Sequence, residues 1–202
     1  MTTTAHPTSP YLADMGRRSL ARDAVLVVAA TALIAVSAQL VIPLPFTPVP
    51  ITLATLTVMA SGAALGPLRG TLSAGLYLLI GALGAPVFSH GQSGVLLPTF
   101  GYIVGYVIAA LVVGQLARRQ ADRRVGPAVG LAVLGTLALY VCGVPWLAVS
   151  LHIPIGDAIV LGVLPFLIGD ALKIVVLSIL LPSWWRLTDA TRTRMRNESD
   201  AA

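Results

Sequence analysis

The chain has 202 residues, of which 56% are hydrophobic and only 10% are charged, and its formal net charge is +5. A soluble globular domain carries about 25% charged residues, so this composition excludes a soluble domain and indicates a single membrane domain. The basic excess does not indicate nucleic-acid binding, because the Arg residues cluster at the ends of apolar runs, where they orient helices in a membrane.

The N-terminal part of the sequence predicts a tail followed by a first membrane span. Residues 1–23 are polar and basic, and we expect a mostly flexible cytoplasmic tail. The apolar run 24–42 after these basic residues resembles the pattern of a cleaved signal peptide. Its removal would break the topology described below, so we expect no cleavage. The next segment, 43–50, contains four prolines and predicts an extended connection, because Pro interrupts helices.

The next two apolar runs predict a tight helical hairpin. Residues 51–65 and 68–83 are separated by Gly66 and Pro67. Each run is shorter than the roughly 20 residues that a full membrane span needs. We therefore expect two short helices joined by a turn that carries Arg69.

The second half of the sequence predicts three more spans. After a Gly-containing loop at 84–98, the apolar run 100–117 is the fourth span and 126–150 is the fifth. The segment 152–164 is too short to cross a bilayer and predicts a partial or re-entrant helix. The sixth span is expected at 165–184.

The C-terminal end predicts an interface followed by a second tail. Trp184 and Trp185 are expected to anchor the sixth span at the membrane surface, and residues 186–202 to form a cytoplasmic tail. The expected domains are therefore the tail 1–23, a transmembrane domain at 24–185 and the tail 186–202.

The distribution of cations predicts the topology. Of the 13 Lys and Arg residues, 12 lie in the two tails, at the predicted turn (Arg69) or at 118–124, and the other is Lys173. The intervening connections at 43–50, 84–98 and 151–157 contain none. Because cytoplasmic loops are enriched in Lys and Arg, we expect an all-α membrane protein with six transmembrane helices and both termini in the cytoplasm.

Small residues recur at helical spacing and predict close helix packing. The two clearest rows are Gly62, Gly66 and Gly70, and Gly101, Gly105 and Ala109. The first span carries a mostly small face formed by Ala21, Ala24, Ala29, Ala32, Ala35 and Ala38. This face could dock onto another membrane subunit or pack inside its own bundle, and the sequence leaves both alternatives open.

Asp170 and Lys173 form the most informative pair in the chain. They lie three residues apart and project from one helix face, about 14 to 18 Å above an inner boundary near Pro182. Each charge costs roughly 2.5 to 3.5 kcal/mol at the helix centre on insertion scales. A helix-locking ion pair is one explanation. We favour the other, the polar floor of a small-molecule pocket, because intramembrane ionisable residues normally line a cavity or path.

Other polar residues on the uncharged side of the predicted bundle are candidates for the same pocket. Each alone is better explained as a loop or helix-end residue than as a ligand contact, and the histidines lack the carboxylate neighbours of a metal site. As a set, the candidate substrate-binding residues are Asp170, Lys173, Ser89, His90, Gln92, Ser93, Tyr102 and Thr52.

Several functions are excluded by missing motifs. The sequence contains neither GxxxxGK[ST] nor GxGxxG, so we expect no ATP hydrolysis by this chain. It also lacks HExxH and a paired acid or Ser–His arrangement for catalysis. An intramembrane enzyme with Asp170 as acid or base would need a second catalytic group, and only Lys173 is present at that depth. We expect no enzymatic activity, no metal and no cofactor.

Four stretches together resemble the BioY family, the biotin-binding substrate-capture subunits of energy-coupling-factor vitamin transporters. They are PVPITLATL at 48–56, LGPLRGTLSAGLYLLIGALGAPVF at 65–88, LPTFGYIVGY at 97–106 and LPFLIGDALK at 164–173. The resemblance implies a six-helix bundle with an extracellular biotin pocket covered by loops. It implies ligand contacts from Asp170 and Lys173, with further contacts among residues 89–93.

The resemblance also implies the function and the partners. The chain would capture biotin in the cell membrane and work with a transmembrane coupling subunit and separate ATP-hydrolysing subunits. Asp170 could accept the ureido N–H groups of biotin, and Lys173 could meet its carbonyl or its carboxylate; the sequence leaves open which end of biotin meets the pair. Two alternatives are capture of another small vitamin or biotin precursor, and a structural membrane subunit with an internal ion pair.

Overall fold

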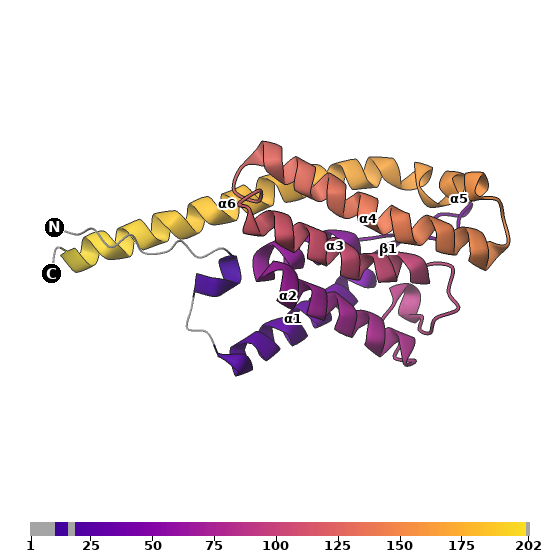
Figure 1. Ribbon diagram of the computed structural model, residues 1–202, viewed down its shortest axis with the longest axis horizontal. Helices are drawn as coiled ribbons and strands as arrows, with labels where there is room; N and C mark the ends of the chain where they lie inside the picture. The colour runs from indigo at the N-terminus through magenta and orange to yellow at the C-terminus, as the bar shows by residue number, and fades with distance from the viewer. Residues whose placement is uncertain (1–10, 16–18, 201–202) are drawn as a thin grey trace.

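The computed structural model describes residues 11–15 and 19–200 (Figure 1). Much of the predicted N-terminal tail, at 1–10 and 16–18, and the last two residues lie outside this part of the chain. The described elements are η1 (Leu12–Met15), α1 (Leu20–Ala38), β1 (Val41–Ile42), β2 (Ile51–Thr52), α2 (Ala54–Ala82), η2 (Ser89–Gly91), α3 (Phe100–Arg118), α4 (Val125–Leu151), α5 (Ile155–Gly162), η3 (Leu164–Phe166) and α6 (Leu167–Asp200).

The described residues form a helical bundle built to lie in a membrane. Five helical stretches in this part of the chain are long and apolar enough to cross a bilayer: Leu20–Ala38, Ala54–Ala82, Phe100–Arg118, Val125–Leu151 and Ile155–Thr188. Large apolar side chains such as Ile168, Val141 and Leu172 point away from the protein, which suits contact with lipid rather than water. The chain is a multi-pass membrane protein.

The helices pack in a simple order. α3 lies between α2 and α4, α1 packs against α2, and α6 packs against α4 (Figure 1). The long C-terminal extension of α6 projects from one end of the bundle, and α5 lies at the opposite end (Figure 1). One buried cluster, which includes Ile34, Tyr77 and Tyr106, joins the first three long helices.

The helix α2 is divided by a sharp turn at Gly66. Gly66 has φ 85°, a left-handed backbone conformation that favours glycine. The chain folds back there, as the close approach of its two segments shows: a Cβ on Gly70 would lie 2.7 Å from the Cα of Gly62. The two segments thus form the predicted hairpin, with Gly66 as its turn. Arg69 follows in the second segment and pairs with Asp23 of α1 at 3.0 Å.

The predicted close packing through small residues is confirmed. A Cβ on Gly62 would lie 2.7 Å from the carbonyl oxygen of Ala110 on α3. A Cβ on Gly105 would lie 2.9 Å from the Cα of Leu139 on α4. These helices therefore approach each other so closely that a larger residue at either glycine would force the backbones apart.

The small face of α1 is mostly uncovered. Ala21, Ala24, Ala29 and Ala32 are exposed, whereas Ala38 is buried. Packing inside the chain's own bundle is therefore wrong for most of this face. Docking of the face onto another membrane subunit stays a prediction.

Three details differ from the prediction. The fold is not purely helical, because Val41 pairs with Thr52, and Ile42 with Ile51, in a small antiparallel hairpin around the proline segment. The helix α6 continues to Asp200 instead of ending near Trp184, since no Gly or Pro follows Pro182 to stop it.

The anchoring role predicted for Trp185 is also wrong. Trp184 is exposed, as an anchor at the membrane surface would be, but Trp185 is buried. Its indole Nε1 donates a hydrogen bond to Asp122 at 2.6 Å, which joins α6 to the loop between α3 and α4. The guanidinium group of Arg123 lies over the Trp185 ring, with its carbon 4.2 Å from the ring centroid.

Candidate ligand-binding site

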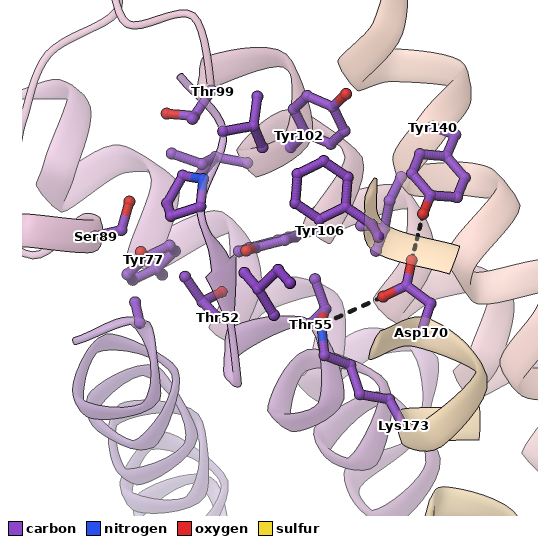
Figure 2. Close-up of a pocket in the computed structure, with 17 residues that line it drawn as sticks. Thr52, Thr55, Tyr77, Ser89, Thr99, Tyr102, Tyr106, Tyr140, Asp170 and Lys173 are labelled. Atoms are coloured by element: carbon purple, nitrogen blue, oxygen red, sulfur yellow. Dashed lines mark hydrogen bonds and ion pairs between the residues drawn. The ribbon is translucent and has the colours of Figure 1, made fainter. Parts of the chain in front are cut away.

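Asp170 and Lys173 lie at the floor of a cavity between the helices (Figure 2). Both belong to the first turns of α6, and their spacing places them on one side of the helix. Lys173 Nζ lies 3.3 Å from Asp170 Oδ1. The side chains are only 9% and 13% exposed, respectively, so the pair is shielded from solvent.

Tyr140 on α4 completes this polar group. Its hydroxyl donates a hydrogen bond to Asp170 Oδ2, the oxygen that Lys173 does not contact (Figure 2). The two oxygens of Asp170 therefore have different partners. Oδ2 is held by Tyr140 of the neighbouring helix α4, and Oδ1 by Lys173 of the same helix, α6.

The walls of the cavity are largely aromatic and aliphatic. Tyr77 and Tyr106 stack with ring centroids 6.2 Å apart, and Tyr102 is fixed by donating a hydrogen bond to the Gly162 carbonyl at 2.9 Å. Such faces suit an apolar ring of a ligand. The remaining lining residues are Ala38, Val49, Pro50, Ile51, Thr52, Thr55, Ser89, Thr99, Ile103, Leu139 and Phe166.

Five of the eight predicted site residues line this cavity. They come from four separate parts of the chain: Thr52 from β2, Ser89 from η2, Tyr102 from α3, and Asp170 and Lys173 from α6. The fold therefore brings together side chains that are more than 100 positions apart in the sequence, as the numbers of Thr52 and Asp170 show.

The other three predicted residues, His90, Gln92 and Ser93, belong to the same loop as Ser89 but do not line the cavity. His90 and Gln92 are exposed. Contact between these three residues and a ligand stays a prediction.

The loop that carries Ser89 is attached to the end of α1 by Gln39. The amide Nε2 of Gln39 donates to the carbonyl oxygens of Val87 at 3.1 Å and Phe88 at 3.0 Å. Its Oε1 accepts a hydrogen bond from the Gly91 N–H at 3.2 Å. These three bonds hold the loop over the cavity.

Two hydroxyl groups in the cavity lining are available for a ligand. The Oγ1 atoms of Thr55 and Thr99 are buried and have no hydrogen-bond partner among the described residues. An unpaired buried polar group costs about 1–3 kcal/mol, and a ligand that bonds to it would remove this cost. The site therefore offers neutral polar groups in addition to the charged pair.

Sequence reasoning missed three lining tyrosines, Tyr77, Tyr106 and Tyr140. A usable signal was present. The chain has five tyrosines, and the four that follow Tyr11 all line the cavity. A Tyr in the middle of an apolar span, away from the interfaces where Tyr is enriched, needs a buried partner for its hydroxyl, and this marks a polar cavity.

The arrangement suits a compact ligand with an apolar ring and both donor and acceptor groups. Lys173 and the hydroxyl groups can donate, and Asp170 can accept. The described residues contain no group of three or more His, Cys, Asp or Glu side chains placed to hold a metal ion. The fold and the cavity together define a multi-pass membrane protein with a cavity between its helices that has a charged floor and largely apolar walls.

Comparison with known proteins identifies the family. The chain belongs to the BioY family, whose model matches residues 5–190. The biotin transporter BioY of Thermotoga maritima is 39% identical over 153 residues, which cover 74% of this chain and 88% of that protein. The probable biotin transporter BioY of Pyrococcus horikoshii is 37% identical over 156 residues, 76% of this chain and 90% of its own length.

The fold also matches a solved structure. The crystal structure of the S-component for biotin from an ECF-type ABC transporter superposes with a TM-score of 0.74. The match covers 84% of this chain and 95% of that one, at 24% sequence identity. At this identity the match establishes the shared fold alone.

Proposed function

We propose that this chain captures biotin as the substrate-binding subunit of an ECF-type transporter and so provides for biotin uptake. The observation that carries the proposal is the shielded Asp170–Lys173 pair inside a cavity of a chain that belongs to the BioY family. Relatives that share more than a third of their aligned residues are named biotin transporters. The chain is a transporter component and not an enzyme.

The chemistry of the cavity fits biotin. Biotin has a ureido ring with N–H donors and a carbonyl acceptor, an apolar thioether ring and a carboxylate tail. Asp170 can accept the N–H groups, Lys173 can donate to the carbonyl or the carboxylate, and the tyrosine rings can pack against the thioether ring. We propose ligand contacts from these two residues and from Thr52, Ser89, His90, Gln92, Ser93 and Tyr102.

We further propose that the chain lies in the cell membrane and crosses it six times, with both termini in the cytoplasm. The two segments of α2 would then count as separate spans. The absence of a phosphate-binding loop from the sequence means that transport energy comes from elsewhere. Its proposed sources are a transmembrane coupling subunit and separate ATP-hydrolysing subunits, with no role for nucleic acid.

Binding of labelled biotin to the purified protein tests the proposal. We expect tight binding by the wild-type chain and a loss of about tenfold or more in Lys173→Ala, because the variant removes a charged donor to biotin, and a hydrogen bond to a charged group contributes about 1.5–3 kcal/mol. Wild-type affinity no better than that of the mutant would overturn the proposal. Competition by unlabelled vitamins and biotin precursors distinguishes biotin from a related substrate.

The explanation as a structural ion pair has its own test. The double variant Asp170→Asn with Lys173→Met removes both charges and keeps both side chains similar in size. A helix lock would tolerate this change, because replacing a buried ion pair by neutral groups is often nearly neutral for stability. We expect the variant to fold and to lose biotin uptake.

A further inference from the structure

Asp170 is held by hydrogen bonds from two different helices. Lys173, one turn further along α6, contacts Oδ1 at 3.3 Å. Tyr140 reaches across from α4 and donates to Oδ2. Figure 2 shows the Tyr140 hydroxyl pointing directly at the carboxylate, with the Lys173 bond on its other side. The Tyr140 bond is thus the one shown there that fixes Asp170 relative to the neighbouring helix α4.

A single-bonded carboxylate on the first turns of a helix can rotate about its side-chain torsions. Lys173 does not prevent this rotation, because its own side chain is long and flexible. A tyrosine ring has few torsions, and α4 and α6 pack against each other. The hydroxyl of Tyr140 therefore gives Asp170 a fixed orientation before a ligand arrives.

From this geometry we infer that Tyr140 is a positioning residue for the binding site, acting through Asp170. This inference rests on the proposed function and deepens it. Tyr140 occupies Oδ2, so that Oδ1 and the adjacent Lys173 ammonium are the groups presented to the ligand. A donor of the ligand is then directed to one oxygen, and the site distinguishes ligands by where that donor lies.

The test is a double-mutant cycle on biotin affinity. Tyr140→Phe removes one oxygen atom and keeps the ring that lines the cavity. We expect it to weaken biotin binding about tenfold, because Asp170 loses its fixed orientation and its side chain must then be ordered when biotin binds. In an Asp170→Ala background the same change is expected to alter affinity less than about twofold, because the group through which Tyr140 acts is gone.

Tyr102→Phe is the matched control. Tyr102 also lines the cavity, but its hydroxyl donates to the Gly162 carbonyl and not to Asp170. Its effect on affinity, whatever its size, is therefore expected to be the same with and without Asp170. Thermal unfolding of each variant without ligand shows whether the fold is kept.

Two results would overturn the inference. One is an unchanged affinity in Tyr140→Phe. The other is an equal loss in the Asp170→Ala background, which would make Tyr140 a direct ligand contact. If Asp170→Ala does not fold, or binds biotin too weakly for an affinity to be measured, Asp170→Asn replaces it. There Tyr140→Phe should cost about threefold instead of tenfold, because a hydrogen bond to a neutral acceptor is roughly half as strong.

Failure of the proposed function gives a different result. If the wild-type chain does not bind biotin, the substrate assignment is wrong, and there is no wild-type affinity with which to compare the variants. If the wild-type chain binds biotin and Tyr140→Phe binds it equally well, only the positioning role is wrong.

Discussion

Thr55 and Thr99 show how single groups in the cavity are balanced between stability and binding. Their hydroxyls are buried without a partner among the described residues. Thr31 on α1 is also buried, but its hydroxyl has two carbonyl acceptors within reach of its one proton, Val27 at 2.9 Å and Ser73 at 3.0 Å. The same chemical group is therefore unsatisfied at two positions and satisfied at a third.

Replacing either cavity threonine by valine is predicted to stabilise the empty protein and weaken the complex. Thr55→Val and Thr99→Val remove an unpaired polar atom and keep the shape, which should raise the free energy of unfolding by about 1 kcal/mol. The stabilisation that biotin adds should become smaller. Thermal unfolding with and without biotin measures both effects.

Thr31→Val is the control for this prediction. It removes a hydroxyl that has hydrogen-bond partners and lies outside the cavity lining, so it should lower the melting temperature and leave biotin affinity unchanged. Cavity variants that lower the melting temperature of the empty protein would contradict the argument for unsatisfied hydroxyls.

Asp122 is a second residue whose surroundings predict a measurable effect. It is 0% exposed. Burial raises the pKa of its carboxyl group, and the hydrogen bond from Trp185 opposes this shift in part. The folded protein therefore binds the proton more tightly than the unfolded chain, and the ionised carboxylate lowers stability at pH values above the folded-state pKa.

From this sign we predict that Asp122→Asn raises the melting temperature at neutral pH, because the amide oxygen still accepts the Trp185 bond and carries no charge. The difference from the wild type should shrink as the pH falls through the raised pKa. Trp185→Phe should act in the opposite direction, with a loss of about 1–3 kcal/mol, since it leaves the carboxylate without its donor. Unfolding curves over a pH series measure these differences. A stabilising effect of Trp185→Phe would contradict the argument that the Asp122 carboxylate needs the Trp185 hydrogen bond.

At the scale of the elements, most helices could be predicted from the apolar runs. A membrane span requires about 20 apolar residues, and few other structures contain an apolar run of that length. The span predicted at 100–117 is observed at Phe100–Arg118, and 126–150 at Val125–Leu151. Two features that depend on contacts between distant residues were not predicted. The β1–β2 pairing needs Val41 to meet Thr52, and the burial of Trp185 needs the loop that contains Asp122.

The turn at Gly66 can be tested against a second glycine of the same element. At Gly66 a Cβ would meet the Tyr11 ring at 2.7 Å, and φ is 85°. At Gly75, in the second segment of α2, nothing lies within 4 Å of such a Cβ. The two positions thus differ in both backbone conformation and available space.

Gly66→Ala is predicted to destabilise the protein by about 1–3 kcal/mol, the cost of a strained backbone position. Gly75→Ala should stabilise it by about 0.4–1 kcal/mol, because it reduces the entropy of the unfolded chain. Thermal unfolding in detergent measures both. Equal effects of the two variants would mean that the turn does not require glycine.

At the scale of the whole molecule, the candidate site was predicted only in part. The charges of Asp170 and Lys173 stand out in an apolar run, so their sequence context alone marks them. The position of Tyr140 inside an apolar span marks it as a cavity residue, but not as the partner of Asp170. That role comes from the packing of α4 against α6 and is found only when the fold is known.

The uncovered face of α1 gives the last prediction, which concerns assembly. Ala24, Ala29 and Ala32 are exposed on this helix, and small residues are typical of surfaces where membrane helices approach closely. If the coupling subunit packs here, Ala29→Trp should prevent its co-purification with this chain. Biotin affinity should stay within about twofold, because Ala29 does not line the cavity. Val141→Trp, at an equally outward position on α4, is the control and should assemble normally. Normal assembly of Ala29→Trp would show that the partner binds another face.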